Sequence, residues 1–202
     1  MRKLIVLCCL IFSAVHSQNT MSVTSPNGDL SVNLVLKNGK IMYSVKYKSG
    51  IILEDSPLGF ITNTGDFSSN MNFVISETAS VDESYNQTRI KQSKVSYKAN
   101  TLKCSFTNAK DQKIAVLFQV SNNNIAFRYE LPSWGDTKAC VIMEEKTGFK
   151  FPSSTTTFLS PMMKSMTGFA RTAPSYESGY EADAPLNKNT SCWTIPIFCL
   201  NE

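Results

Sequence analysis

Histidine is almost absent from this sequence, because His16 is the only one among its 202 residues. It lies in an N-terminal segment that we expect to be removed, so the mature chain would contain none. Without histidine, Ser-His-Asp and Cys-His catalysis, a histidine general base and histidine-ligated zinc are all excluded. Acid–base or metal chemistry in this protein would therefore have to use carboxylates.

A hydrophobic run long enough to span a membrane is also missing. Two basic residues precede an apolar stretch over residues 4–12, which is too short to cross a bilayer, and small residues follow up to Ser17. This order is typical of a secretory signal peptide rather than of a membrane anchor. We therefore predict a signal peptide over residues 1–17 and an exported chain over 18–202, secreted or periplasmic, with no membrane span.

Positive charge is present only in small excess. The formal net charge is +4 at pH 7, and it falls by two when removal of the signal peptide takes away Arg2 and Lys3. A protein that binds nucleic acid usually carries a strongly basic surface. We therefore expect no nucleic-acid partner.

Cysteines with the CxxC spacing of a zinc site are lacking as well. Four cysteines remain after the signal peptide: Cys104, Cys140, Cys192 and Cys199. In an exported protein they predict one or two disulfides or buried thiols. The sequence leaves all three possible pairings open, and the oligomeric state with them.

No segment shows the 3.6-residue periodicity of a helix, and alternation with a period of two takes its place. In residues 113–131, apolar side chains alternate with others on both sides of the Ser-Asn-Asn-Asn run at 121–124. Asparagine tolerates the positive φ of a tight turn, so we predict a hairpin. A hairpin cannot bury its apolar face alone, and we expect this one at the centre of a larger sheet.

Similar alternation recurs along the chain. Residues 30–36 and 41–47 alternate around Asn38-Gly39, which is a strong hairpin signal. The other expected strands cover residues 71–75, 155–159 and 194–200, and a hairpin is expected from 95 to 106. Between the strands we expect a turn at 54–59 and polar loops at 62–70 and 77–89. Residues 162–186 are expected to form a long loop or a series of short extended pieces. Together these patterns predict an all-β fold of two packed antiparallel sheets.

Carboxylates gather in two places. Glu144 and Glu145 are adjacent, so they would face opposite sides of a strand, and we expect both at the solvated surface. Glu177, Glu181 and Asp183 lie among aromatic residues on a segment that contains glycine and proline. Such loops often carry function, although a solvated loop explains the same pattern. A glycosidase pair would need two carboxylates opposed across a sugar, which spacing alone does not establish.

Several segments together resemble the N-terminal domain of glycoside hydrolase family 97. They are 24–28 (TSPNG), 56–59 (SPLG), 118–120 (FQV), 125–132 (IAFRYELP) and 144–149 (EEKTGF), and above all 166–180 (MTGFARTAPSYESGY) with 182–186 (ADAPL). The last two are similar to the retaining, α-galactosidase-type branch of the family. The resemblance covers most of the mature chain, and its specificity comes from the order and spacing of these motifs.

The resemblance implies an exported α-glycosidase, an α-galactosidase or α-glucosidase, that acts on an α-linked oligosaccharide or glycoside. Its N-terminal domain would be an antiparallel β-super-sandwich of the galactose-mutarotase type, followed by a catalytic (β/α)8 barrel and a C-terminal β-domain. The catalytic carboxylates would lie in the barrel, so we expect residues 18–202 to hold no catalytic residue and to be inactive alone. The tail over 187–202 is only loosely similar, and we expect the super-sandwich to be truncated at its C-terminus.

The resemblance also implies a metal ligand. In the family, the glutamate of a Tyr-Glu-x-x-Tyr segment reaches from the sandwich to a calcium ion in the active site, and by position that residue is Glu177. Calcium would then be shared with the downstream barrel domain. The alternative hypothesis is a free-standing secreted β-sandwich that binds carbohydrate or a protein partner and catalyses nothing. Glu177 favours the glycosidase, because a pure binding module has no need of a lone metal carboxylate.

Overall fold

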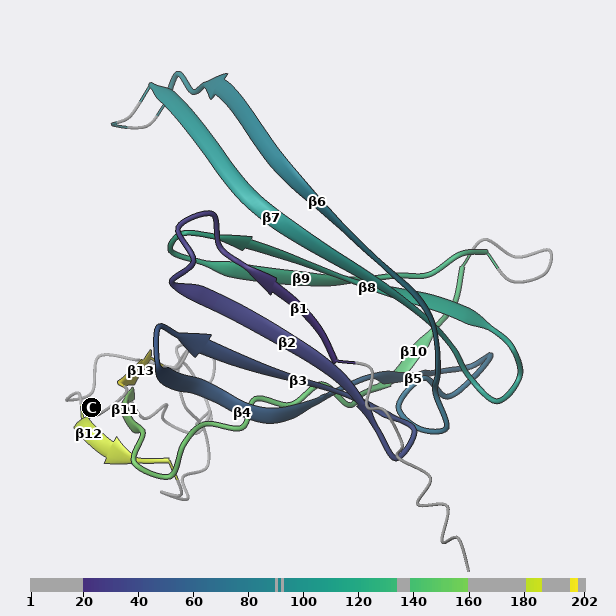
Figure 1. The fold of residues 1–202 in the computed structure, drawn as a ribbon. Helices are drawn as coiled ribbons and strands as arrows, with labels where there is room; N and C mark the ends of the chain where they lie inside the picture. Colours follow the sequence, from purple (N-terminus) through teal and green to yellow (C-terminus); the bar gives the residue numbers. More distant parts are fainter. Residues whose placement is uncertain are drawn as a thin grey trace, which may run out of the picture.

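The computed structural model describes residues 20–89, 91, 93–133, 139–159, 181–186 and 197–199. These residues form strands and no helix, and the two largest sheets pack face to face as a sandwich (Figure 1). Every strand pair is antiparallel. The predicted all-β fold of packed antiparallel sheets is therefore confirmed for this part of the chain. This part also contains no helix long and apolar enough for a membrane crossing.

One large sheet has the strand order β1-β2-β3-β4. Its strands are β1 (Thr20–Thr24), β2 (Leu30–Lys37), β3 (Lys40–Tyr47) and β4 (Gly50–Leu58). The predicted hairpin is confirmed as β2–β3, with Asn38 and Gly39 in the turn at φ of 51° and 71°. Asparagine and glycine adopt this left-handed conformation at the lowest cost, which is why the pair specifies the turn.

The turn predicted over residues 54–59 is wrong for most of its length, because β4 continues to Leu58. Pro57 is tolerated inside the strand because β4 is the last strand in the order of its sheet. The β3–β4 register shifts between Tyr43 and Val45, which marks a bulge close to this point. Gly59, with a φ of 152°, separates β4 from β5 (Phe60–Thr62).

The second large sheet has the order β6-β7-β8-β9. Its strands are β6 (Asn72–Asn86), β7 (Lys94–Thr107), β8 (Lys113–Ser121) and β9 (Ile125–Glu130). The hairpin predicted within 113–131 is confirmed as β8–β9. Its expected position at the centre of the sheet is wrong, because no described strand pairs with the far side of β9. Further strands, β7 and then β6, are added only on the β8 side of the hairpin.

The loop predicted over residues 77–89 is also wrong, because β6 continues to Asn86 and pairs with β7 throughout. For the same reason the hairpin expected from 95 to 106 is a single long strand, β7. Nearly all β6 side chains are exposed, so apolar alternation does not mark the strand. Backbone hydrogen bonds and cross-strand pairs hold it instead, such as the 3.0 Å ion pair between Asp82 and Lys98.

Two small sheets complete the described part of the chain. One pairs β5 (Phe60–Thr62) with β10 (Ile142–Glu145), and the other has β11 (Thr156–Leu159) between β12 (Glu181–Pro185) and β13 (Ile197–Cys199). The strand expected at 155–159 is thus confirmed, as is the described part of the one expected at 194–200. The pieces expected over 162–186 include β12, and residues 162–180 lie outside the described residues.

The core lies between the two large sheets. Its side chains with 0% exposure come from both sheets and from the loop after β5: Val32, Leu34, Ile41, Phe67, Cys104, Phe106, Val116, Phe118 and Val120. On the β1 side, the Asn100 side-chain amide donates a 2.8 Å hydrogen bond to the Thr24 carbonyl of the facing sheet. The predicted loop after β5 therefore contributes a buried aromatic ring to the core as well as connecting strands.

Cys104 and Cys140 are free thiols, so at most one of the expected disulfides can form, between Cys192 and Cys199. Cys192 and the side chain of Cys199 lie outside the described residues. Cys104 is fully buried, with its Sγ 3.5 Å from the Met21 sulfur, and burial raises its pKa to about 12. The buried-thiol alternative is therefore the correct one for Cys104.

We expect the two free thiols to differ strongly in reactivity. At about pH 8, a thiol with this pKa has a thiolate fraction roughly a thousandfold below that of an ordinary cysteine, and burial restricts access further. Brief treatment of the folded protein with iodoacetamide should therefore label half-buried Cys140 and spare Cys104, as mapped by mass spectrometry. A urea-unfolded sample is the control, in which both must react. Equal labelling of Cys104 with and without urea would contradict its burial.

Candidate functional site

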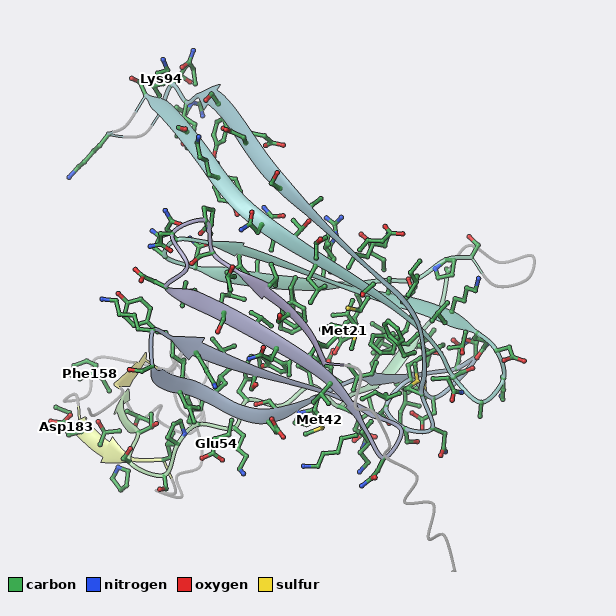
Figure 2. All side chains as sticks on the ribbon, viewed as in Figure 1. Met21, Met42, Glu54, Lys94, Phe158 and Asp183 are labelled. Carbon is green, nitrogen blue, oxygen red and sulfur yellow. The ribbon has the colours of Figure 1, made fainter. Side chains whose placement is uncertain are left out.

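The expected calcium ligand, Glu177, lies outside the described residues, as does most of the segment that carries it. The strand that follows is described: β12 begins at Glu181, four residues later. β12 pairs with β11 in the small sheet around Phe158 and Asp183, which Figure 2 labels. This sheet is therefore the part of the candidate site that the structure shows.

A β-bulge shapes the pairing of β11 with β12. The register shifts between Thr157 and Leu159, and Asp183 takes a φ of 54°. The Thr156 hydroxyl donates a 3.3 Å hydrogen bond to the exposed Asp183 carboxylate, and the Thr157 hydroxyl donates one of 2.9 Å to the Ala184 carbonyl. The Asp183 side chain is thus held beside β11. Bulges are common next to active sites, where they redirect a side chain or end a ladder.

The chain reaches this sheet through residues 146–150, which we call the strap. Three backbone hydrogen bonds join it to β4 and Gly59: Lys146 N–H donates to the Gly59 carbonyl (2.8 Å), Gly148 N–H to the Pro57 carbonyl (2.9 Å), and Glu54 N–H to the Lys150 carbonyl (2.8 Å). The Ser56 hydroxyl oxygen also accepts from Lys150 N–H at 2.9 Å. The strap fixes the chain against the sandwich only six residues before β11 begins.

Two tyrosines hold the strap from the core side. The Tyr129 hydroxyl accepts a 2.9 Å hydrogen bond from Gly59 N–H and lies 2.6 Å from the Thr147 hydroxyl. The Tyr43 hydroxyl donates to the Gly148 carbonyl at 3.1 Å. Burial raises the pKa of each tyrosine to about 12, although at Tyr129 the hydrogen bonds with Thr147 and Gly59 act in the opposite direction. Both hydroxyls therefore stay protonated at neutral pH and act as structural hydrogen-bonding groups, not as acids or bases.

Gly59 is the point where β4, β9 and the strap meet. Its N–H binds Tyr129 and its carbonyl binds Lys146. A Cβ at this position would lie 2.7 Å from the Phe67 carbonyl oxygen and 2.7 Å from the Ser68 Cα. Backbone cannot move aside as a flexible side chain can, so the junction requires glycine.

Glu144 and Glu145 are both exposed on β10, as expected. Glu144 forms an ion pair with Lys146. Glu145 accepts hydrogen bonds from the Thr147 side chain and, at 3.3 Å, from its backbone N–H. These contacts hold both carboxylates beside the strap, which follows them in the chain, and so fix the positions of the two side chains at the surface.

Two other carboxyl groups have lowered pKa values. Burial alone would raise the pKa of Asp66, but hydrogen bonds from Ser68 and Ser69 outweigh it and lower the pKa. Glu130 has a lowered pKa because Lys103 and Arg128 both contact it. Neither group has the raised pKa that a glycosidase general acid needs at neutral pH. Within the described ranges, no three His, Cys, Asp or Glu side chains gather as a metal-binding group.

A cavity of 290 Å³ opens between the two large sheets, near the turn between β8 and β9. Its lining is mainly aliphatic and aromatic, with two amides: Leu30, Tyr43, Val45, Ile52, Leu53, Phe118, Asn123, Asn124, Ile125, Phe127 and Phe149. Among the described residues no carboxylate lines it, so these residues offer no acid–base pair of the glycosidase kind there.

The sequence did not reveal the junction at Gly59. Alternation placed Tyr129 on the core face of β9, but its hydroxyl partners lie 70 residues before it and 18 residues after it in the chain. One signal was available, since a buried tyrosine hydroxyl needs a hydrogen-bond partner. No local pattern identifies which backbone group that partner is.

Comparisons of the sequence with protein families and of the structure with solved structures point to the same family. The sequence model described as Glycosyl-hydrolase 97 N-terminal matches residues 23–202. Among solved structures, a beta-arabinopyranosidase superposes with a TM-score of 0.81 at 43% sequence identity, over 88% of this chain and 29% of that one. No curated protein matches the chain.

A Glycoside Hydrolase Family 97 enzyme from Pseudoalteromonas sp. strain K8 shares the fold. In its complexes with panose and with acarbose it superposes with a TM-score of 0.65 at 21% identity, over 70% of this chain and 22% of that one. This chain therefore spans less than a third of the length of these solved structures.

We expect Gly59→Ala to unfold the protein far more easily than Gly28→Ala. Both glycines have positive φ, but a Cβ at Gly28 meets nothing within 4 Å. Backbone strain alone should cost about 1 kcal/mol at Gly28, whereas strain and steric overlap should cost roughly 2–5 kcal/mol at Gly59. Urea unfolding of both variants measures this difference. Equal losses would mean that the junction has room for a side chain.

The stability should also fall at alkaline pH. The pKa of Tyr43 and Tyr129 is about 12 in the folded state and about 10 in the unfolded state. The stabilisation is therefore complete below pH 10 and is lost as the pH rises through 12, because only the unfolded chain ionises in that window. Urea unfolding across this range should show a shallower decline for Tyr129→Phe than for the parent protein. Identical slopes would exclude Tyr129 as a contributor.

Proposed function

This chain belongs to glycoside hydrolase family 97, whose N-terminal domain it contains over residues 23–202, and we propose that it supports the sugar site of an exported α-glycosidase. The observation that carries the proposal is the family match along almost the whole chain. The family domain is an antiparallel β-sandwich, and that is the architecture seen here. Export is proposed from the signal peptide expected over residues 1–17.

We propose that the catalytic residues lie in a barrel domain downstream of this one. The chain covers 29% of the beta-arabinopyranosidase and 22% of the Pseudoalteromonas enzyme, which leaves ample length for such a domain in proteins of this kind. The strap and β11 would then place β12 at the boundary with that domain. On this proposal the sandwich contributes support and one ligand, and no catalytic residue.

The proposed substrate is an α-galactoside or a β-arabinopyranoside. Two similarities support this class: the motifs over 166–180 and 182–186 are similar to the α-galactosidase-type branch, and the structure at 43% identity is a beta-arabinopyranosidase. In ring configuration, a β-L-arabinopyranoside corresponds to an α-D-galactopyranoside without the exocyclic CH2OH group. Discrimination between the two would depend on contacts to that group alone.

Glu177 is proposed as the one calcium ligand that this domain supplies. A carboxylate offers at most two of the six to eight oxygens that calcium takes, and the described carboxylates form no metal-binding group. The remaining ligands would therefore come from the barrel. Bound there, calcium supplies a fixed positive charge at the sugar site. The role of this chain is to hold Glu177 in place through the pairing of β12 with β11, which the Thr157 hydroxyl reinforces.

Glu177→Gln in the full-length enzyme should weaken calcium binding by about tenfold or more, because a charged ligand is lost. Hydrolysis of aryl α-galactosides and β-L-arabinopyranosides should fall with it, while thermal unfolding in EDTA stays unchanged. Calcium titration by calorimetry and initial rates measure the two effects. Glu77→Gln, at an exposed position on β6, is the matched control and should alter neither. If the two variants behave alike, Glu177 is a solvated loop residue.

A further inference from the structure

The outer half of the β6–β7 hairpin projects beyond the sandwich (Figure 1). β8 pairs with β7 only as far as Ala99, which is opposite Ser121. Further out, β7 pairs with β6 alone as far as the Asn86–Lys94 pair, and the 2.7 Å hydrogen bond from Gln87 N–H to the Ser93 carbonyl closes the ladder. We call residues 82–98 of this hairpin the arm. Figure 2 places Lys94 at its far end.

The end of the arm is strongly basic. The sequence contains no aspartate or glutamate between Glu83 and Asp111. Arg89, Lys91 and Lys94 are exposed in and beside the turn. The nearest acidic residue along the strands is exposed Glu83, which lies opposite Tyr97, and its neighbour Asp82 is paired with Lys98 at 3.0 Å. The tip therefore concentrates three positive charges with no carboxylate of its own, on a chain whose net charge is small.

The other exposed groups at the tip are hydroxyls and amides: Ser84, Asn86, Thr88, Ser93 and Ser96. Tyr85 adds one aromatic ring at 45% exposure. A site on a membrane surface normally offers several apolar side chains for insertion, and the described part of the tip offers only this ring. Hydroxyls, amides and one amphipathic ring are instead suited to the hydroxyl groups and ring faces of sugars.

We infer that the arm tip binds an anionic polysaccharide, a chain of sugars that carries carboxylates. Arg89, Lys91 and Lys94 pair with the carboxylates, and the surrounding hydroxyl and amide side chains bind sugar hydroxyls. The inference rests on the carbohydrate class of the proposed function, but it does not involve Glu177 or calcium. Binding at the arm would raise the effective concentration of the enzyme near its polymer, since one attached site keeps a second within reach.

The test uses the full-length protein in EDTA, with immobilised polygalacturonate as the probe and its methyl ester as the uncharged match. The triple variant Arg89→Gln, Lys91→Gln, Lys94→Gln should lose about tenfold in affinity, as expected for three exposed charge pairs. The loss should shrink at high salt. A control variant with the same change in charge, Lys40→Gln, Lys46→Gln, Lys110→Gln, alters exposed lysines elsewhere and should bind as the parent does.

Three outcomes would overturn the inference: equal losses in the two triple variants, equal binding of polygalacturonate and its methyl ester, or no binding by the parent protein. Tip-dependent binding to vesicles of phosphatidylglycerol and phosphatidylcholine, without polygalacturonate binding, would also overturn it in favour of a membrane contact. Hydrolysis of small aryl glycosides should be unchanged in both variants. Failure at the tip is therefore distinguishable from failure of the proposed support of the sugar site, which the Glu177 variant tests.

Discussion

The contact between the apolar faces of the two large sheets is the interaction on which the rest of the structure depends. Neither sheet can bury its apolar face alone, and each fully buried large side chain contributes roughly 1.5–3 kcal/mol when it is removed from water. Phe118 lies at the centre of this contact, with its ring centroid 5.8 Å from that of Tyr43 on the facing sheet and 5.5 Å from that of Phe127 beside it. The sandwich is thus closed by side chains from both layers.

The same aromatic contact also positions the polar groups at one end of the sandwich. Tyr43 and Tyr129 are held by the core, and their hydroxyls reach outward to the strap at residues 146–150. The strap in turn lies along β4 through backbone hydrogen bonds and leads into β11. The small sheet of β11 and β12 is therefore connected to the core by a short series of contacts. That connection suits a domain whose role is to support a site completed elsewhere.

The two ends of the second sheet have different surroundings. One face of β8 and β9 packs into the core, and the other carries charged side chains such as Arg128 and Glu130, with Glu130 paired to Lys103 on β7. Along the arm there is no facing sheet, so the strands show few apolar residues and rely on backbone pairing and on the Asp82–Lys98 contact. The loss of burial leaves the tip free to carry charge that the core could not accommodate.

The sequence by itself determined the all-β class, the two tight hairpins and the surface position of Glu144 and Glu145. These features follow from local rules: alternation marks a strand with one buried face, and Asn38-Gly39 specifies a left-handed turn. The family resemblance likewise came from the order of short motifs, which needs no coordinates.

Tertiary structure decided what local rules do not encode. The extension of β6 into the arm could not be read from alternation, because no second layer buries one of its faces. The placement of the β8–β9 hairpin at a sheet edge depended on which strand pairs with β8. The free thiol of Cys104 and the junction of Gly59 with Tyr129 depend on segments that are distant in the chain and meet only once the sheets have packed.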